Sequence, residues 1–115
     1  MIILVSYTKG DCEKMHILII NFNLQEMSQA QYLEVCDEVA TAFADIPGLI
    51  SKKWLANEET NTYGGVYLWE DKQSMLDYKG SEIFKQLADT PTFVNVTATD
   101  FDLLAGPSKI TRAIS

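Results

Sequence analysis

Aromatic side chains gather in one part of the chain, and they have the clearest capacity to bind a ligand. Tyr67 and Trp69 lie two positions apart, so they share one face if their segment is a strand. Gly65 leaves room on that face, while Trp54 and Phe22 could join from neighbouring segments. We expect a flat apolar slot with a phenol and an indole N–H as its polar groups. The alternative is that these rings only pack the core or a subunit interface.

Two polar residues of an early apolar run are candidates for catalysis. Histidine is the side chain that most readily exchanges a proton near neutral pH, so His16, the single histidine, is the candidate base. Asn21 lies in the same run and must find a hydrogen-bond partner if it is buried. The partner of Asn21 is either the backbone or a bound ligand or oxygen molecule. For His16, the alternative to catalysis is a purely structural role.

The chain lacks the common motifs of metal, nucleotide and nucleophile chemistry. No nucleophile elbow, phosphate-binding loop, dinucleotide fingerprint or HExxH helix occurs in the sequence. Cys12 and Cys36 form no CxxC pair, and with one histidine they cannot supply a usual zinc or iron site. We therefore expect no metal and no cofactor, and two free thiols in a reducing cytosol.

Composition and charge narrow the possible partners. The chain has 115 residues, 47% of them hydrophobic and 22% charged, which suits one globular domain. Its net charge of −7 would repel nucleic acid and anionic membrane surfaces. No segment approaches the roughly 20 apolar residues of a membrane span. We expect a cytoplasmic protein that binds neither nucleic acid nor membrane.

The first half of the chain predicts a strand, a helix and a second strand. Residues 16–22 are apolar at almost every position, which is typical of a strand buried on both faces. Ser28 with Gln31 forms a capping box that begins a helix, and Pro47-Gly48 ends it. Residues 49–57 and 62–70 then predict an antiparallel hairpin. Within the second of these strands, Gly64-Gly65 indicates a bulge or a close approach to the backbone.

The second half predicts helical turns and a last strand. Asp71 and Ser81 are helix caps, and Gly80 separates their two helical segments. Residues 93–104 predict a long strand whose apolar positions change parity, so we expect a bulge near Thr99-Asp100.

The order of these elements, β-α-β-β-α-β, predicts an α+β ferredoxin-like fold with a four-stranded antiparallel sheet. Both helices of such a fold cover one face of the sheet. A first strand that is apolar on both faces needs cover on the other side. A second copy of the sheet is the simplest cover, and the alternative is that the N-terminal segment covers part of that side. We therefore expect a homodimer.

Several short motifs together resemble the YdhR-like monooxygenase family over roughly residues 15–112. They are Pro47-Gly48-Leu49, Lys53-Trp54, Gly64-Gly65-Val66-Tyr67-Leu68-Trp69 with Asp71 and Ser74, Asn21-Phe22-Asn23, and Phe101-Asp102. The resemblance implies a dimeric α/β barrel in which two ferredoxin-like sheets pack face to face. It also implies cofactor-independent oxygenation of a small aromatic or quinol-type substrate. Residues 1–14 are then an N-terminal extension of uncertain structure, and residues 15–115 form the ferredoxin-like domain.

Two other functions are compatible with the sequence. The same aromatic pocket could serve a non-catalytic protein that binds small molecules. Relatives with this architecture also bind or degrade haem, but they place a histidine on a helix, whereas His16 is expected on a strand. The candidate site residues are thus His16 and Asn21 for catalysis, and Phe22, Trp54, Tyr67 and Trp69 for substrate binding.

Overall fold

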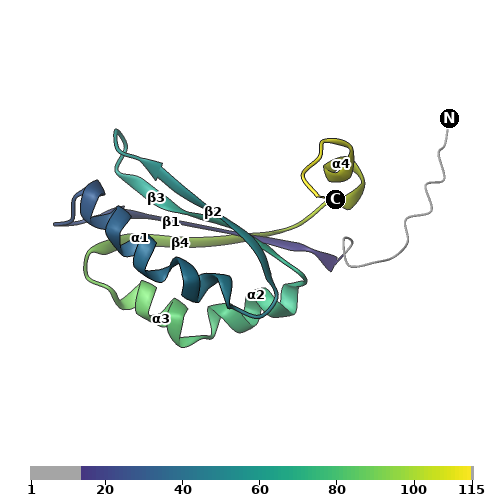
Figure 1. Ribbon diagram of the computed structural model, residues 1–115, viewed down its shortest axis with the longest axis horizontal. Helices are drawn as coiled ribbons and strands as arrows, with labels where there is room; N and C mark the ends of the chain where they lie inside the picture. The colour runs from purple at the N-terminus through teal and green to yellow at the C-terminus, as the bar shows by residue number, and fades with distance from the viewer. Residues whose placement is uncertain (1–13, 115) are drawn as a thin grey trace.

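The computed structural model describes residues 14–114, and its elements follow one another in the order β-α-β-β-α-α-β-α (Figure 1). Their bounds are β1 His16–Leu24, α1 Gln29–Ala44, β2 Leu49–Asn57, β3 Thr62–Trp69, α2 Lys72–Lys79, α3 Glu82–Asp89, β4 Phe93–Asp102 and α4 Ala105–Ile110. The predicted ferredoxin-like order is confirmed, with the second helical region divided at Gly80 and one short helix added after the last strand.

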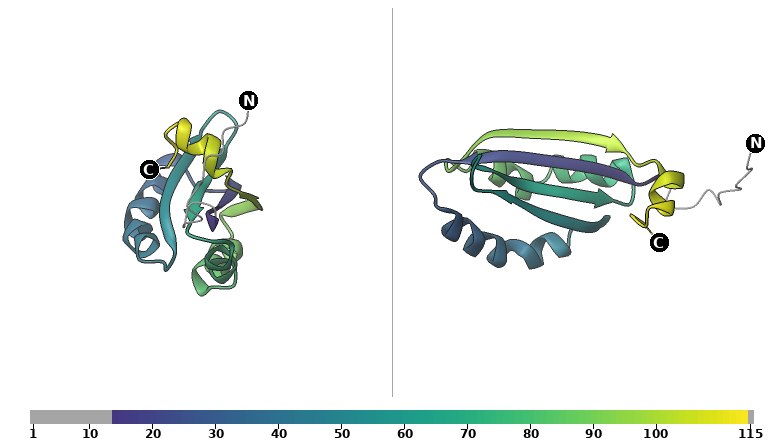
Figure 2. Two further views of the ribbon diagram at one scale, coloured as in Figure 1. Left: turned by 90° about the vertical axis from the view of Figure 1, so that its right-hand side faces the viewer. Right: turned by 90° about the horizontal axis from the view of Figure 1, so that it is seen from above.

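The four strands form one antiparallel sheet in the order β2-β3-β1-β4. Helices α1, α2 and α3 lie on the same side of this sheet, and α4 lies beyond its end (Figures 1 and 2). No helix among residues 14–114 is long and apolar enough to cross a membrane.

Strand β1 alternates between the two faces of the sheet. Leu18 and Ile20 point to the helices and are fully buried, while Ile17 and Ile19, which alternate with them, are only half-buried. The side chains of a strand alternate in direction, so the half-buried pair lies on the face that no helix among residues 14–114 covers. We call this uncovered side of the sheet the open face, and it carries a row of apolar residues. They are Ile17, Ile19, Leu55, Val66, Leu68, Val94 and Phe101.

The helix boundaries follow the predicted capping residues. The Ser28 side chain accepts a hydrogen bond from the Gln31 backbone N–H, and the Gln31 side chain accepts one from Ser28. Two donors that have no partner within the helix are thereby satisfied at once. Asp71 and Ser81 begin α2 and α3 in the same way, each accepting from a backbone N–H three residues later. These local signals set the residues at which the three helices begin.

The bulge in β4 lies at a different place from the predicted one. The register of β4 against β1 shifts between Asn21 and Asn23, opposite Asn95, whose φ is +56°. The sequence predicts the bulge near Thr99-Asp100, and that position is wrong. The prediction assumed that Phe101 packs in the core, whereas Phe101 lies on the open face and is 50% exposed. The strand therefore needs no second bulge to place Phe101.

Two further segments of the chain precede β1 and follow β4. The predicted N-terminal extension, with Cys12, lies almost entirely outside the described residues, and the described cysteine, Cys36, is a free thiol on α1. Helix α4, which the sequence does not predict, carries the exposed apolar side chain of Ile110 and follows the exposed Leu104.

Candidate functional site

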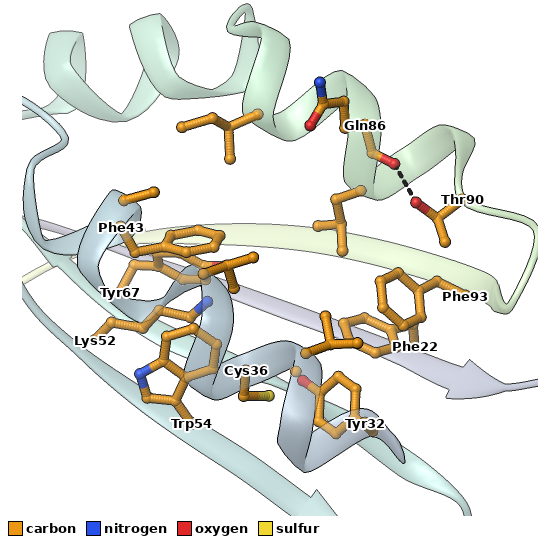
Figure 3. Close-up of a pocket in the computed structure, with 16 residues that line it drawn as sticks. Phe22, Tyr32, Cys36, Phe43, Lys52, Trp54, Tyr67, Gln86, Thr90 and Phe93 are labelled. Carbon is orange, nitrogen blue, oxygen red and sulfur yellow. Dashed lines mark hydrogen bonds between the residues drawn. The ribbon is translucent and has the colours of Figure 1, made fainter. Parts of the chain in front are cut away.

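A cavity of about 250 Å³ lies between α1, α3 and the helix-facing side of the sheet. Its wall is mainly apolar and aromatic and comes from six elements: the four strands β1, β2, β3 and β4 and the two helices α1 and α3 (Figure 3). The lining residues include Phe22, Tyr32, Val35, Cys36, Val39, Ala42, Phe43, Lys52, Trp54, Tyr67, Ile83, Gln86, Leu87, Thr90 and Phe93. A concave apolar site with few polar groups is the usual form of a pocket for a small ligand.

Two aromatic groups form opposite ends of the cavity. At one end the Phe22 ring centroid lies 5.7 Å from that of Tyr32 and 4.7 Å from that of Phe93. At the other end the Phe43 ring meets Trp54 edge to face at 5.4 Å. Such pairs hold one another in fixed orientations, so the walls are organised before a ligand arrives.

Lys52 places an amine among these rings, and no other described residue of the lining carries one. Its Nζ atom lies 3.5 Å from the ring centroid of Phe43 and 3.5 Å from that of Trp54. The ring centroid of Tyr67 is 4.7 Å away. Figure 3 shows the lysine chain running between Phe43 and Trp54, with its nitrogen beside their rings. The amine is thus held by three aromatic faces instead of a carboxylate.

Gly65 makes this position of Lys52 possible. A Cβ atom at residue 65 would stand 2.8 Å from Lys52 Cε and 3.1 Å from the Tyr67 ring. At the preceding residue, Gly64, φ is +148° and a Cβ would collide with the carbonyl oxygen of Ile20. The close approach predicted for this glycine pair is therefore confirmed, and one of the approaching groups is the lysine.

Burial changes the acid–base chemistry of the cavity wall. Desolvation among the rings lowers the pKa of Lys52 to about 7, while the nearby Cys36 thiol acts in the opposite direction. The ring faces also attract a cation, so the site accommodates both the amine and the ammonium form. Burial raises the pKa of the Cys36 thiol and of the Tyr67 phenol, so these two groups stay protonated. Lys52 is consequently the group of the wall that can exchange a proton near neutrality.

The predicted binding residues divide into two sets. Phe22, Trp54 and Tyr67 line the cavity together. Trp69 lies behind that wall, fully buried, with its ring stacked on Tyr67 at 6.0 Å and close to Tyr78 at 5.2 Å. Its indole nitrogen has no hydrogen-bond partner among residues 14–114. The structure therefore places Trp69 as a support for Tyr67, one layer below the cavity.

His16 lies apart from the cavity lining, in a cluster with two carboxylates. Its Nε2 atom is 2.6 Å from Asp100 Oδ2, and its Nδ1 atom is 3.1 Å from Asp102 Oδ1. The imidazole itself is buried. Its hydrogen bond holds the pKa of Asp100 below the ordinary aspartate value. Both ring nitrogens are thus engaged by β4.

Asn21 lies on the open face. Its side-chain amide donates to the backbone oxygen of Tyr63 at 3.4 Å, across the β1–β3 pair. Because β1 side chains alternate, Asn21 points away from Phe22 and the cavity. Of the two partners that the sequence leaves open for Asn21, the structure shows the backbone.

In the sequence, Lys52 and Lys53 beside Trp54 could attract an anionic ligand, but a solvated strand edge is the favoured interpretation, so Lys52 is absent from the candidate site residues. Lys52 follows Ser51 and precedes Lys53 in a polar-looking run, which is typical of a solvated strand edge. The available signal was positional: Lys52 has the same strand parity as Trp54, so both point to the helix-covered face. Tyr32 and Cys36 lie four positions apart and so share one side of a helix, but no local signal shows that α1 stands far enough from the sheet to leave a cavity.

Metal ligands do not gather in the part of the chain that the structure describes. No group of three or more His, Cys, Asp or Glu side chains among residues 14–114 is arranged to hold a metal ion. The cavity lining also lacks His16, the chain's single histidine, so it cannot supply an imidazole ligand to a haem iron.

Solved structures with the same fold have low sequence identity to this chain. The NE2512 protein of unknown function from Nitrosomonas europaea is 14% identical, with a TM-score of 0.67 over 81% of this chain and 92% of that one. SnoaB, a cofactor-independent oxygenase from Streptomyces nogalater, is 16% identical, with a TM-score of 0.63 over 78% and 93%. MhuD, in a structure with manganese protoporphyrin IX bound, is 14% identical, with a TM-score of 0.62 over 77% and 94%. These likenesses establish a shared fold.

The family assignment rests on the sequence itself. No curated protein sequence matches the chain. The family described as "Putative mono-oxygenase ydhR" matches residues 17–114, nearly the whole region that the structure describes. The resemblance carried by the glycine-aromatic strand and its neighbouring motifs is confirmed over this range: the chain belongs to the ydhR mono-oxygenase family.

Proposed function

We propose that this protein is a cofactor-independent monooxygenase that acts on a small aromatic substrate of the phenol or quinol type. The observation that carries the proposal is the aromatic cavity of about 250 Å³, whose wall holds the Lys52 amine against three aromatic rings. A planar, largely apolar molecule with one acidic group matches these walls. Membership of the mono-oxygenase family supports oxygenation as the reaction.

The proposed reaction needs only substrate and dioxygen. Deprotonation of the enol form of an electron-rich aromatic substrate gives an anion with negative charge on a ring carbon, and this anion can reduce dioxygen directly. A C–O bond forms, and the resulting hydroperoxide loses water as its O–O bond breaks. The net change converts a ring CH₂ into C=O, with one oxygen atom in the product and the other in water. The protein contributes a dry cavity, a proton acceptor and neutral donors such as Tyr67.

We further propose that two chains pair through their open faces. Ile17, Ile19 and Val66 lie at the centre of that face, half-buried and without a covering helix. The face is self-complementary in chemistry, because its apolar row would meet the same row of the second copy. Closed two-fold pairing is the commonest way to cover such a surface. Each cavity lies on the opposite, helix-covered side of its own sheet.

Oxygen consumption tests the catalytic proposal. The purified chain is incubated with 1,8-dihydroxyanthrone and related quinols, and oxygen uptake and quinone formation are followed with and without dioxygen. We expect oxygen-dependent turnover, with one atom of labelled dioxygen in the product. Ligand binding without oxygen uptake would instead identify a non-catalytic binding protein, which the same cavity also supports.

A matched pair of variants ties this activity to the cavity. Ala42 lines it from α1, and Ala44 lies on the same helix but is absent from the lining. Ala42→Phe should fill the space and abolish both binding and turnover, whereas Ala44→Phe should preserve them. Equal activities of the two variants would place the reaction elsewhere on the molecule.

A further inference from the structure

We propose that Lys52 is the proton acceptor of the cavity, and that its ammonium form then holds the substrate anion. The ligand class is an aromatic phenol or enol that binds as its conjugate base. The proton transfer is ArOH + Lys52–NH₂ → ArO⁻ + Lys52–NH₃⁺, with no change in oxidation state. This inference rests on the proposed function for the identity of the ligand, but ionisation of the ligand can be observed without dioxygen.

The geometry favours this role for Lys52 over a structural one. A lysine whose stem serves only to cover apolar surface normally extends its charged end into water. The Lys52 nitrogen instead lies 3.5 Å from each of two ring centroids, on the cavity side of β2. Gly65 provides the room for that path at a position where even a methyl group would press on the lysine. The chain thus holds the amine inside the site.

Among the described residues that line the cavity, none carries a permanent negative charge that would fix the protonation state of Lys52. The titratable groups in the lining that face it are Cys36 and Tyr32 from α1 and Tyr67 from β3. Burial keeps all three protonated at neutral pH by raising their pKa values. Helix α3 contributes Gln86 and Thr90, which are uncharged. A neutral amine is therefore available to accept a proton from the ligand. The deprotonated ligand then becomes the counter-ion of the Lys52 ammonium.

The same arrangement explains why an anionic product of proton transfer would stay in the cavity. In a largely apolar site, an ammonium and a phenolate attract each other much more strongly than in water. Neither ion alone is well solvated by the rings. Proton transfer and ion pairing therefore reinforce each other, and the site selects molecules acidic enough to give up a proton to an amine of this strength.

The test is an anaerobic titration with 4-nitrophenol, whose ionised form absorbs at a longer wavelength than its neutral form. The solution is weakly buffered, and a pH indicator reports the protons released on binding. At a pH where free 4-nitrophenol is partly protonated and Lys52 is mainly neutral, we expect wild-type protein to bind the phenolate without releasing a proton. Each neutral molecule bound passes its proton to Lys52, and each molecule that was already ionised takes one proton up from solution. Lys52→Arg supplies a cation that cannot accept a proton, so it should bind the phenolate with release of one proton for each neutral molecule ionised. Lys52→Met should bind the neutral phenol or lose binding.

Lys53→Met is the matched control, because Lys53 neighbours Lys52 on β2 but points to the open face. This variant should reproduce the wild-type spectrum and proton balance. Equal proton release by wild type and Lys52→Arg, a neutral bound probe in wild type, or no binding by wild type would overturn the proposal. Phenolate binding without oxygen uptake on quinols would sustain the role of Lys52 while refuting the oxygenase. Full oxygen uptake by Lys52→Met would refute the role of Lys52 while sustaining the oxygenase.

Discussion

Gly65 lies directly beneath the side chain of Lys52: a Cβ atom at position 65 would stand 2.8 Å from Lys52 Cε. Real Cβ atoms do not come this close to a neighbouring carbon, so the lysine stem can follow its path only above a glycine. One strand position on β3 thereby controls where an amine on β2 points. The glycine that marks the family resemblance is thus coupled to the chemistry of the cavity.

Gly65→Ala should move the Lys52 amine away from its rings. With the amine closer to water, its pKa should rise from about 7 toward the ordinary lysine value of 10.5. The rate at which acetic anhydride modifies Lys52, measured by mass spectrometry across a pH series, reports the neutral fraction. We expect the midpoint to shift upward in Gly65→Ala. Gly80→Ala is the control, because a Cβ there makes only ordinary contacts, and an unchanged midpoint at Gly65→Ala would contradict this account.

Ser28→Ala should weaken the start of α1, the helix that forms one wall of the cavity. It removes the acceptor of the Gln31 N–H and breaks the reciprocal capping pair. Losses of this kind cost about 1 kcal/mol in the free energy of unfolding. Urea denaturation followed by circular dichroism measures the change. Glu38→Ala, at an exposed position inside the same helix, should change stability much less, and a similar loss in both variants would show that the cap is not responsible.

The fold was accessible from sequence because its signals are local. A capping box, two further caps and a polar connection between two strand-like runs each act within a few residues. They predict β1, α1 and the β2–β3 hairpin closely. The bulge in β4 was not accessible in this way, since it depends on which face of the sheet Phe101 occupies. That choice is made by pairing with β1, which lies far away in the chain.

The site was only partly accessible for the same reason. Phe22, Trp54 and Tyr67 line the cavity, and they could be predicted as binding residues because aromatic type and strand parity can be read from the sequence. The position of Trp69 behind Tyr67 depends on how α2 and Tyr78 pack over the end of the sheet. The role of Lys52 depends on a cavity that exists only when α1, α3 and the sheet are assembled. Burial by distant elements cannot be read from a run of neighbouring polar residues.

Asp100→Asn should alter the dependence of stability on pH. The hydrogen bond from His16 lowers the pKa of Asp100 in the folded chain. The stability from this pair is therefore present above the ordinary aspartate pKa of 3.8 and is lost as the pH falls through the lower folded value. We expect the variant to have a lower urea midpoint at neutral pH and a shallower decline in acid. Asp89→Asn, which removes an exposed pair with Lys85, should follow the wild-type profile. Parallel profiles for wild type and Asp100→Asn would contradict the prediction.

Ile19→Asp should separate the proposed dimer. Ile19 pairs with Val66 at the centre of the open face, so two-fold pairing would bury a carboxylate from each chain within the apolar row. An uncompensated buried charge costs about 3–5 kcal/mol, enough to raise the dissociation constant at least about a hundredfold. Sedimentation equilibrium measures the change. Glu38→Lys, a charge change on an exposed position of α1, should leave the association intact. A wild-type chain that sediments as a monomer at all concentrations would refute the dimer.

Trp54→Phe should separate the two tryptophan signals of the chain and locate ligand binding. Trp54 is 37% exposed and lines the cavity, whereas Trp69 is fully buried behind Tyr67. An aromatic ligand in the cavity should quench Trp54 in the wild type, and the quenching should be largely lost when only Trp69 remains. Trp54→Ala removes one ring of the wall and should weaken binding by about 1 kcal/mol, roughly fivefold in the dissociation constant. Trp69→Phe is the matched comparison: its fluorescence comes from Trp54 alone, so ligand quenching should persist and become a larger share of the signal. Quenching that follows Trp69 instead would place the ligand beneath α2, outside the cavity described above.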